Sequence, residues 1–281
     1  MEGAVTQQWP PEGGAETAKA RAVIDTSVAH QSRIYDYWLG GKDNFAVDRE
    51  AAEQAIAAYP TIVRGVRAQR AFLARAVRYL AEQEGILQFL DIGTGLPTAN
   101  NTHEVAQAAA PAARVVYVDN DPIVLAHARA LLTSTPQGAT SYLDADLRDP
   151  DKILAGAADL LNFSRPVAVL LIGILQLIPD GDDPHAIVGR LIGAIPRGSW
   201  LAVYHPASDI DMFRVGEAVR RVNARSANAT TLRSYDQVTQ FFDGLELIEP
   251  GVVQVHRWWP GAAAPDDGEQ IAAYAGLARK P

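Results

Sequence analysis

The sequence predicts an α/β protein with a doubly wound, seven-stranded, mostly parallel sheet, an antiparallel C-terminal edge and an N-terminal helical lid. Between residues 85 and 205, short apolar segments alternate with helix-like segments, which is the pattern of successive right-handed βαβ units. The apolar segments are continuous, as expected for parallel strands that are buried on both faces. We expect these strands at residues 88–92, 114–118, 140–144, 166–172 and 199–204.

Helices are expected between the strands and before them. Apolar residues at helical spacing predict helices at 48–58 and 62–83. Asp25 and Ser27 can cap a shorter helix upstream, which Gly40 and Gly41 would end. In the C-terminal part, β-like segments at 245–255 and 271–278 flank a polar turn at 265–268 and can pair as the antiparallel edge. The remaining helices are predicted at 98–110, 122–133, 150–161, 184–195, 208–225 and 234–242.

Composition and charge limit the class of protein. The chain has 281 residues, of which 48% are hydrophobic, and this is enough for a sizeable core. Its net charge of −8 argues against a nucleic-acid partner, which usually needs a basic surface. The sequence contains no cysteine and no apolar stretch long enough for a membrane span. We therefore expect a cytoplasmic protein without disulfides or zinc–thiolate sites.

The chain is expected to divide into three parts. Residues 1–22 are rich in Gly, Ala, Pro and Glu without a clear period, which predicts a flexible N-terminal tail. Residues 23–84 would form a helical cap or lid, and residues 85–281 the main α/β domain.

A glycine loop follows the first predicted strand, in the segment Asp91-Ile92-Gly93-Thr94-Gly95. Its two glycines allow a tight turn and leave room for a ligand, although such a loop alone also fits an ordinary strand-to-helix turn. The fingerprint of NAD-binding proteins needs a third glycine where this chain has Thr98. Asp91 would repel a pyrophosphate and suits a ligand that carries an ammonium group.

Acidic residues also follow the next two strands. Asp119 ends the second strand, where a carboxylate can accept two hydrogen bonds from a ribose diol. Asp121 precedes Pro122 and is assigned to capping the following helix. After the third strand, Asp146 can accept from an exocyclic adenine amine while the next backbone N–H donates to the ring. Together these strand ends predict a pocket for an adenosine that bears a cationic group.

Residues 85–205 resemble class I S-adenosylmethionine-dependent methyltransferases. DIGTG at 91–95 is similar to their DxGxG motif, Asp119 and Asp146 match the second and third motifs, and IGILQ at 172–176 matches the fourth. Pro97 departs from the pattern, which commonly has a third glycine there. From about residue 24, the segments RIYDYWLGGKDNFAVDREAAE, QFLDIGTGLPT and ARVVYVDNDPIVLAHARALL resemble an actinobacterial S-adenosyl methyltransferase family, formerly domain of unknown function 574.

This resemblance implies a Rossmann-like fold with S-adenosylmethionine as the cofactor. Arg70, in the helix before the glycine loop, could pair with the cofactor's carboxylate or could be solvated. The full set of expected cofactor-binding residues is Asp91, Gly93, Thr94, Gly95, Pro97, Asp119, Asn120, Asp146, Leu147, Gly173 and Arg70.

Candidates for catalysis follow the fourth and fifth strands. Methyl transfer depends largely on alignment, and a base is needed only for a nucleophile that holds a high-pKa proton. His205 is the best candidate base, and Gln176 could orient the substrate or could merely end its strand. Related sequences often have histidine where this chain has Gln176, which puts a base at that position in doubt.

The segment from Arg33 to Asn44 is expected to fold over the cofactor as a lid. The lid would offer apolar walls from Tyr35, Tyr37 and Trp38 and polar contacts from Arg33, Asp36, Lys42 and Asn44. Of these, the expected substrate-binding residues are Arg33, Tyr37, Trp38 and Asn44, although the aromatic residues could instead pack the helix onto the core. The expected function is methyl transfer to a small-molecule acceptor, for example in secondary metabolism. A cofactor-binding sensor without methyl transfer is the alternative, and an NAD-dependent oxidoreductase is a weaker one. No metal site is expected, and a homodimer is one option for the assembly.

Overall fold

The computed structural model describes residues 26–98, 100–131, 134–226, 228–261 and 270–281. It contains one mixed sheet with the strand order β3-β2-β1-β4-β5-β8-β6, in which β7 also pairs with β8. This confirms the predicted doubly wound, mostly parallel sheet with an antiparallel edge. The five parallel strands are β1 (Gln88–Ile92), β2 (Arg114–Asp119), β3 (Ala139–Asp144), β4 (Ala168–Ile172) and β5 (Trp200–Pro206).

The centre of the sheet is the point at which the strand order reverses. Every residue of β1 and β4 is buried, which fits the wholly apolar sequence of β4 and the apolar Phe89, Leu90 and Ile92 of β1. β1 pairs with β2 on one side and with β4 on the other. The carboxyl ends of β1 and β4 therefore border the crevice in which open α/β sheets bind ligands.

The C-terminal edge has one full strand and two short ones. β8 (Ala273–Arg279) runs antiparallel to β5, while β6 (Glu246–Leu247) and β7 (Val253–Gln254) both pair with β8. The predicted single strand at 245–255 is therefore interrupted. Pro250 has no N–H to donate and Gly251 has a φ of +80°, so this part of the chain cannot continue the ladder. The predicted turn at 265–268 lies outside the described residues.

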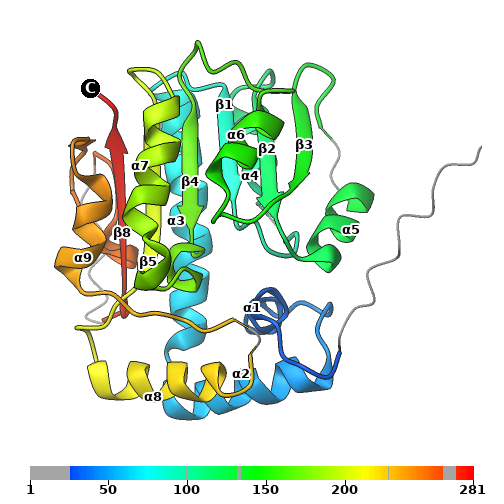
Figure 1. Ribbon diagram of the computed structural model, residues 1–281, viewed down its shortest axis with the longest axis vertical. Helices are drawn as coiled ribbons and strands as arrows, with labels where there is room; N and C mark the ends of the chain where they lie inside the picture. The colour runs from blue at the N-terminus through cyan, green and yellow to red at the C-terminus, as the bar shows by residue number, and fades with distance from the viewer. Residues whose placement is uncertain (1–25, 99, 132–133, 227, 262–269) are drawn as a thin grey trace, which may run out of the picture.

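Two helical layers cover the sheet (Figure 1). Phe72 and Leu73 of α3 pack in the core of one face, and Ile187 and Leu191 of α7 pack in the core of the other. The first layer comprises α3 (Ile62–Glu82), α4 (Thr102–Ala109) and η4 (Val255–Arg257); the second comprises α6 (Pro150–Ala157), α7 (Pro184–Ala194), α9 (Tyr235–Thr239) and η3 (Gln240–Phe242). α5 (Pro122–Leu131) precedes β3 at the edge of the sheet, and the 3₁₀ turns η1 (Leu175–Leu177) and η2 (Asp180–Asp182) follow β4.

Three helices lie across the carboxyl ends of the parallel strands, as Figure 1 shows. They are α1 (Gln31–Leu39), α2 (Ala46–Ala58) and α8 (Met212–Asn223). α8 packs along α2, so the C-terminal half of the chain contributes to this cap. α3 packs on α4 and the sheet and also contacts α1 and α2, so it links the helical layer on the sheet to the helices across the strand ends. The predicted tail, residues 1–22, lies outside the described residues.

Helix ends follow local capping signals. α1 begins at Gln31 after His30, with no side-chain cap, so the predicted cap at Ser27 is wrong, and Asp25 lies outside the described residues. α1 ends at Gly40, whose φ of +84° is the left-handed conformation expected of a terminal glycine. α4 begins at Thr102 rather than at 98, because Asn101 forms a capping box with the third residue of the helix.

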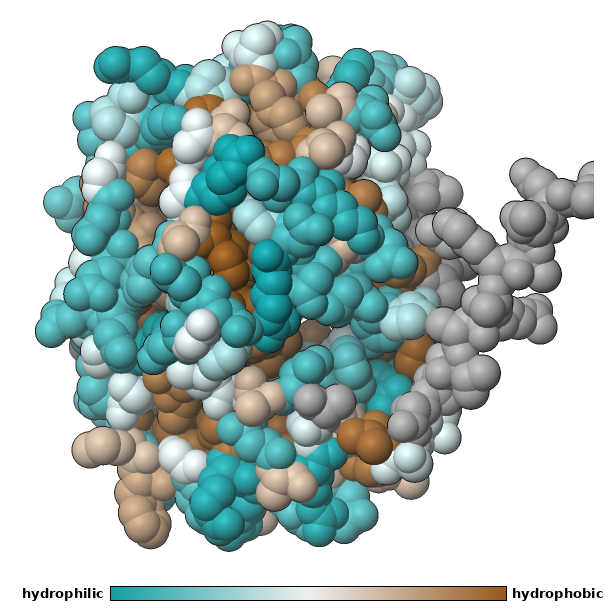
Figure 2. Space-filling model, in the orientation of Figure 1, coloured by the Kyte–Doolittle hydropathy of each residue, from teal (hydrophilic) through white to brown (hydrophobic). Residues whose placement is uncertain are grey.

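The surface is polar over much of the view in Figure 2, with hydrophobic side chains visible between the polar ones. Across the described part of the chain, no helix is both long and apolar enough to cross a membrane. Those same residues contain no group of three or more His, Asp or Glu side chains that could hold a metal ion.

Candidate functional site

The loop after β1 is shaped by its two glycines. Gly93 has a φ of +76°, and a Cβ on it would lie 2.5 Å from Cβ of Ile174, so a side chain there would collide with the loop after β4. Gly95 has a φ of +66°, but a Cβ on it would meet nothing within 4 Å. Gly93 therefore brings two loops together, whereas Gly95 faces open space. Thr94 holds the turn through its hydroxyl, which donates to the carbonyl oxygen of Asp91 at 3.2 Å.

Asp119, at the end of β2, closes this loop from the neighbouring strand. Its Oδ2 accepts from the backbone N–H of Gly95 at 2.9 Å, and its Oδ1 accepts from that of Asp121 at 2.9 Å. Burial raises the pKa of the Asp119 carboxyl, although these two hydrogen bonds oppose the rise. Each carboxylate oxygen keeps a further lone pair for a ligand hydroxyl.

Asp91 is the more deeply buried acid. Its side chain is 5% exposed, and its Oδ2 accepts from the hydroxyl of Thr102 at 2.6 Å. Burial raises the pKa of Asp91 to about 6, with the Thr102 hydrogen bond and the positive charge of Arg70 opposing the rise and Asp119 adding to it. A cation bound beside Asp91 would favour the ionised carboxylate and lower this pKa.

Asp146 follows β3, where Leu147 is buried and Asp146 is half-exposed. Its Oδ2 accepts from the side-chain amide of Asn120 at 2.8 Å, and its Oδ1 accepts from the backbone N–H of Arg148 at 2.8 Å. The backbone N–H of Leu147 makes no hydrogen bond to another described residue. A carboxylate and a free N–H thus lie side by side after β3.

Two adjoining cavities collect these residues at the strand ends. The first, which we call the polar cavity, has a volume of about 880 Å³ including the part open to solvent. The second, the side cavity, has about 490 Å³ on the same measure and shares with it the walls formed by Gly93, Asp119 and Asn120. Of the predicted cofactor residues, the polar cavity is lined by Arg70, Asp91, Gly93, Thr94, Gly95, Asp119, Asn120 and Gly173, and the side cavity also by Asp146 and Leu147. Pro97 lines neither, although its neighbours Leu96 and Thr98 do.

Gln69 also lines the polar cavity, although it belongs to no motif recognisable in the sequence. Its Nε2 donates to the carbonyl oxygen of Ile172 at 2.9 Å, while its buried Oε1 has no hydrogen-bond partner among the described residues. Gly173 lies against the same side chain, since a Cβ on Gly173 would collide with Nε2 of Gln69. An unpartnered carbonyl oxygen here would accept a hydrogen bond from a bound ammonium group.

One face of α1 closes the polar cavity. Ser32, Tyr35, Asp36 and Leu39 line it and follow the spacing of a single helix face. Gln31 lines it as well. The predicted lid segment therefore covers the strand ends. Of the lid residues named from the sequence, Tyr35 and Asp36 line the polar cavity, whereas Arg33 and Tyr37 do not.

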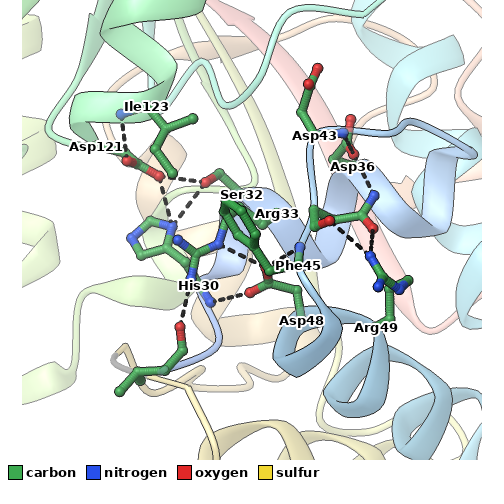
Figure 3. Close-up of polar contacts among 12 residues, drawn as sticks. His30, Ser32, Arg33, Asp36, Asp43, Phe45, Asp48, Arg49, Asp121 and Ile123 are labelled. Atoms are coloured by element: carbon green, nitrogen blue, oxygen red, sulfur yellow. Dashed lines mark hydrogen bonds and ion pairs between the residues drawn. The ribbon is translucent and has the colours of Figure 1, made fainter. Parts of the chain in front are cut away.

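A hydrogen-bonded cluster joins the start of α1 to the start of α5 (Figure 3). Asp121 caps α5, since its Oδ1 accepts from the backbone N–H of Ile123 at 2.9 Å. Its Oδ2 accepts from the Ser32 hydroxyl at 2.7 Å and lies 2.9 Å from Nδ1 of His30. Burial alone would raise the pKa of Asp121, but the contacts to His30 and Ser32 lower it to about 2. His30 and Ser32 were missed because neither belongs to a motif near Asp121 in the sequence.

Three of the four predicted substrate residues lie off the cavities. Arg33 pairs with Asp48 of α2, with its Nε 2.9 Å from the carboxylate; the Tyr37 hydroxyl donates to Glu53 of α2. The side chain of Asn44 donates to Asp36 at 2.7 Å and holds the loop after α1. Their expected contact with substrate is therefore wrong for this arrangement, because these side chains tie α1 to α2 and to its own loop. Trp38 does line a cavity, described next.

A third cavity, which we call the aromatic cavity, lies beside the polar cavity and has a volume of about 630 Å³ including the part open to solvent. Its aromatic walls are Tyr35, Trp38, Tyr59 and Tyr204. Gln31 and Tyr35 line both this cavity and the polar cavity. Further walls come from α3, α8, the segment after β4 and the start of β8, including Ile62, Val66, Gln176, Val219, Val222 and Ala272.

His205 does not face any of these three cavities. It is fully buried, its Nδ1 donates to the carbonyl oxygen of Pro206 at 2.9 Å, and its Nε2 accepts from Arg233 at 2.8 Å. Burial lowers the pKa of His205 to about 3, and the positive charge of Arg233 contributes to the shift. The predicted role of His205 as general base is therefore corrected, because both ring nitrogens are engaged within the fold.

Arg233 was not singled out from the sequence, yet it fixes the loop after β4. It is 1% exposed and donates to the carbonyl oxygens of Leu175 at 2.9 Å and Ile178 at 2.8 Å. It also pairs with Asp180 at 2.7 Å. Arg233 thus holds both ends of the short segment that carries Gln176.

Comparisons with known proteins identify the family of the chain. A family model described as S-adenosyl methyltransferase matches residues 17–281. The chain is similar to a DUF574 family protein from Streptomyces avermitilis, at 47% identity and a TM-score of 0.87, covering 92% of this chain and 99% of that one. It is also similar to a putative methyltransferase from Thermobifida fusca, at 37% identity and a TM-score of 0.84, covering 94% and 99%. No match was found among curated proteins.

A more distant likeness concerns the fold alone. The plantazolicin methyltransferase BamL, solved in complex with a triazolic desmethylPZN analog and SAH, has a TM-score of 0.52 at 9% identity, covering 89% of this chain and 95% of that one. The family match supports an S-adenosylmethionine-dependent methyltransferase rather than an NAD-dependent oxidoreductase or a sensor. Since the family model spans the whole described structure, the chain belongs to the S-adenosyl methyltransferase family.

Proposed function

We propose that this methyltransferase binds S-adenosylmethionine in the polar and side cavities and transfers its methyl group to a small-molecule acceptor. The observation that carries the proposal is the meeting of Asp91, Arg70, Gly95 and Asp119 on the wall of one cavity. When bound, the cofactor supplies an electrophilic methyl group on a sulfonium.

The amino-acid end of the cofactor fits between Asp91 and Arg70. The Asp91 carboxylate and the unpartnered Oε1 of Gln69 would both accept from an ammonium group. Arg70 donates to the carbonyl oxygen of Asn100 at 3.0 Å, and its guanidinium lines the same cavity, where it would pair with a carboxylate. One acid and one base on a shared wall match the zwitterion of an amino acid.

The nucleoside end fits the opposite side. Asp119 would accept from the ribose hydroxyls, and the open space beside Gly95 lets a sugar approach the backbone. Asp146 would accept from the adenine amine, while the free N–H of Leu147 donates to the ring. Asn120, which is bonded to Asp146 at 2.8 Å, would keep that carboxylate oriented.

The acceptor would meet the cofactor where the polar and aromatic cavities adjoin. Gln176 lines the aromatic cavity, and its side-chain amide donates to the carbonyl oxygen of Gly173 at 2.7 Å. Gly173 in turn lines the polar cavity. Gln176 would therefore align the acceptor, and Trp38 would form part of the wall against which it packs. We propose no acid–base role for either residue.

Isothermal titration with S-adenosylmethionine tests the cofactor assignment. The wild-type protein should bind, and Asp119→Ala should weaken binding by about 1–3 kcal/mol, or roughly 5–150-fold, through lost hydrogen bonds to a buried ribose. Asp144→Ala is the matched control, because Asp144 pairs with Asp119 in the sheet register but is exposed and lines none of the three cavities. Absence of binding by a folded wild-type sample would exclude the proposal.

The class of acceptor, the assembly and the cellular location of the enzyme can each be tested. We propose a small molecule rather than a nucleic acid as acceptor, since the net charge is −8 and nucleic-acid sites are generally basic. A gel-shift assay with RNA and DNA would overturn this if it detected tight binding at physiological salt. We also propose a homodimer, which light scattering would test by the molar mass in solution. A cytoplasmic location is proposed as well, and cell fractionation would test it. Identification of the acceptor would test the proposed role in secondary metabolism.

A further inference from the structure

The aromatic cavity is mostly apolar and shares Gln31 and Tyr35 with the polar cavity. Its lining residues, all within the described part of the chain, include no Asp, Glu, His, Lys or Arg. A charged ligand entering such a cavity would lose its hydration without gaining a partner of opposite charge. The flat walls given by Tyr35, Trp38 and Tyr59 suit an aromatic ring system. The composition of the wall therefore selects for a neutral, planar molecule.

Two carbonyl oxygens on this wall have no hydrogen-bond partner among the described residues. They are Oε1 of Gln31 and Oε1 of Gln176, and both atoms are buried. The two side chains are themselves 8% and 1% exposed. For Gln176 the orientation of the amide follows from chemistry, since only its NH₂ group can donate to the carbonyl oxygen of Gly173. The other atom of this amide is therefore Oε1, which can accept a hydrogen bond but cannot donate one.

Leaving such an acceptor unpaired in a buried site is unfavourable, because it loses its hydrogen bond to water without gaining another. A ligand that presents an N–H or O–H group to Gln31 or Gln176 would remove that penalty. Tyr35 lies between the two cavities, and burial keeps its hydroxyl protonated by raising its pKa. The wall thus offers two oxygens that accept, but no carboxylate and no imidazole that could remove a proton.

Among the residues that the structure describes, the aromatic cavity has no base on its wall. On the adjoining part of the polar cavity, Asp36 is held by Asn44 and His30 is held by Asp121. This arrangement favours a nitrogen acceptor over an oxygen acceptor. A hydroxyl group must lose its high-pKa proton as it reacts and is helped by a general base. His205 cannot serve, because both of its ring nitrogens are engaged. A neutral amine already carries a lone pair, and an uncharged cavity disfavours its protonated form.

We propose that the aromatic cavity binds a neutral aromatic amine and that the enzyme methylates it on nitrogen, with Gln31 and Gln176 accepting from its N–H groups. This inference rests on the proposed function. The amine lone pair forms the new bond to the methyl carbon, the carbon–sulfur bond breaks with its electron pair left on sulfur, and the methylated nitrogen releases its proton to water. Hydrogen bonds from N–H to the two amide oxygens orient the nitrogen toward the boundary with the polar cavity.

Binding of matched probes tests this without relying on turnover. We compare 1-naphthylamine, 1-naphthol and 1-naphthoate, which share a ring and differ in the polar group, by titration in the presence of S-adenosylhomocysteine. The amine should bind at least tenfold more tightly than the carboxylate. Val219→Trp, which fills the cavity from α8, should abolish binding of the amine without changing binding of S-adenosylmethionine.

The two glutamines are tested separately, so that misfolding of one variant leaves the other informative. Gln31→Leu on α1 and Gln176→Leu after β4 should each weaken amine binding by about five- to tenfold, the loss of one neutral hydrogen bond of roughly 1 kcal/mol. Gln83→Leu, at an exposed glutamine that ends α3, should change nothing. Equal affinity for amine and carboxylate, or amine binding that survives Val219→Trp, would overturn the proposal.

Product analysis decides the reacting atom. Incubation of each probe with S-adenosylmethionine, followed by mass spectrometry, should yield N-methyl-1-naphthylamine in preference to 1-methoxynaphthalene. Faster methylation of the naphthol would overturn the preference for nitrogen, as would the failure of every neutral probe to bind a protein that does bind S-adenosylmethionine. If S-adenosylmethionine itself does not bind, the proposed function fails. Titration of the probes without cofactor then still shows whether the aromatic cavity prefers the amine to the carboxylate.

Discussion

Replacing Asp91 by Asn should stabilise the free protein at neutral pH and weaken its binding of S-adenosylmethionine. Asp91 is 5% exposed, and its pKa is raised to about 6, chiefly by burial. Asn has nearly the same shape and can still accept from the Thr102 hydroxyl through its Oδ1. The substitution therefore removes a buried negative charge and leaves the packing in place.

The size of the stabilisation follows from the pKa shift. The folded protein binds the Asp91 proton more tightly than the unfolded chain does, so stability falls as pH rises from about 4, near the usual pKa of an aspartate, to about 6, its pKa in the fold. Above that window the full penalty applies. A shift of about 2 units corresponds to on the order of 3 kcal/mol. Asp91→Asn should recover up to that amount at pH 7.5 and progressively less toward pH 4.

Chemical denaturation at pH 7.5 and pH 4.5 measures this difference, and titration calorimetry measures cofactor affinity. Binding should weaken by roughly 10–150-fold in the variant, from loss of a charge-assisted hydrogen bond of about 1.5–3 kcal/mol. In the wild type, affinity should fall as pH drops below about 6 and binding near that pH should release protons. Asp144→Asn, at an exposed strand end, is the control. A variant that is less stable than the wild type at pH 7.5, or that binds the cofactor equally well, would refute the reasoning.

Other substitutions test the glycine loop after β1 and the contacts of Arg233 and His205 with the segment after β4. Gly93→Ala should destabilise by about 2–4 kcal/mol in denaturant melts, because its φ of +76° is combined with a 2.5 Å approach to Ile174. Gly95→Ala should destabilise by only about 1–2 kcal/mol, from its positive φ, but should reduce cofactor affinity at least tenfold; equal effects of the two changes on stability would argue against the loop geometry. Arg233→Met should destabilise by about 2–6 kcal/mol, measured in the same melts, because two buried carbonyl oxygens lose their donor, at roughly 1–3 kcal/mol each. The ¹⁵N shifts of His205 should report an Nδ1–H tautomer that does not titrate between pH 8 and 5, given its pKa of about 3, and a midpoint near 6.5 would contradict its placement.

The cofactor site could be predicted from the sequence because each of its acidic residues comes directly after a strand that the sequence reveals. Asp91, Asp119 and Asp146 each follow a strand that is recognisable from its apolar run, and parallel strands bring their carboxyl ends to one edge. Sheet topology then places them together without further information. The interruption of the last strand at Pro250 was the main departure in the fold, because a single β-like run does not reveal which of its N–H groups the ladder needs.

Two errors arose from choosing the wrong face of a correctly predicted element. Side chains alternate along a strand, so Tyr204 reaches the aromatic cavity while His205 points to the opposite face. On α1, Arg33 and Tyr37 lie four residues apart and share the face that contacts α2. Periodicity gives the spacing of a face, but its direction depends on packing partners that are distant in sequence.

Long-range contacts account for what was missed. The bond from Ser32 to Asp121 joins residues 89 positions apart, and Arg233 reaches back 58 positions to Leu175. Neither pair forms a motif in a single sequence. The contribution of α8 to the aromatic cavity is of the same kind, because an amphipathic helix does not show which surface it will cover.

The most direct test of the account is a crystal structure of the protein with S-adenosylhomocysteine. We expect the adenine beside Asp146 and the N–H of Leu147, the ribose hydroxyls on Asp119, and the amino-acid group between Asp91 and Arg70. The sulfur should then face the boundary between the polar and aromatic cavities. A ligand bound elsewhere, or one whose amino-acid end lies at Asp146, would contradict the central claim that these strand ends form the cofactor site.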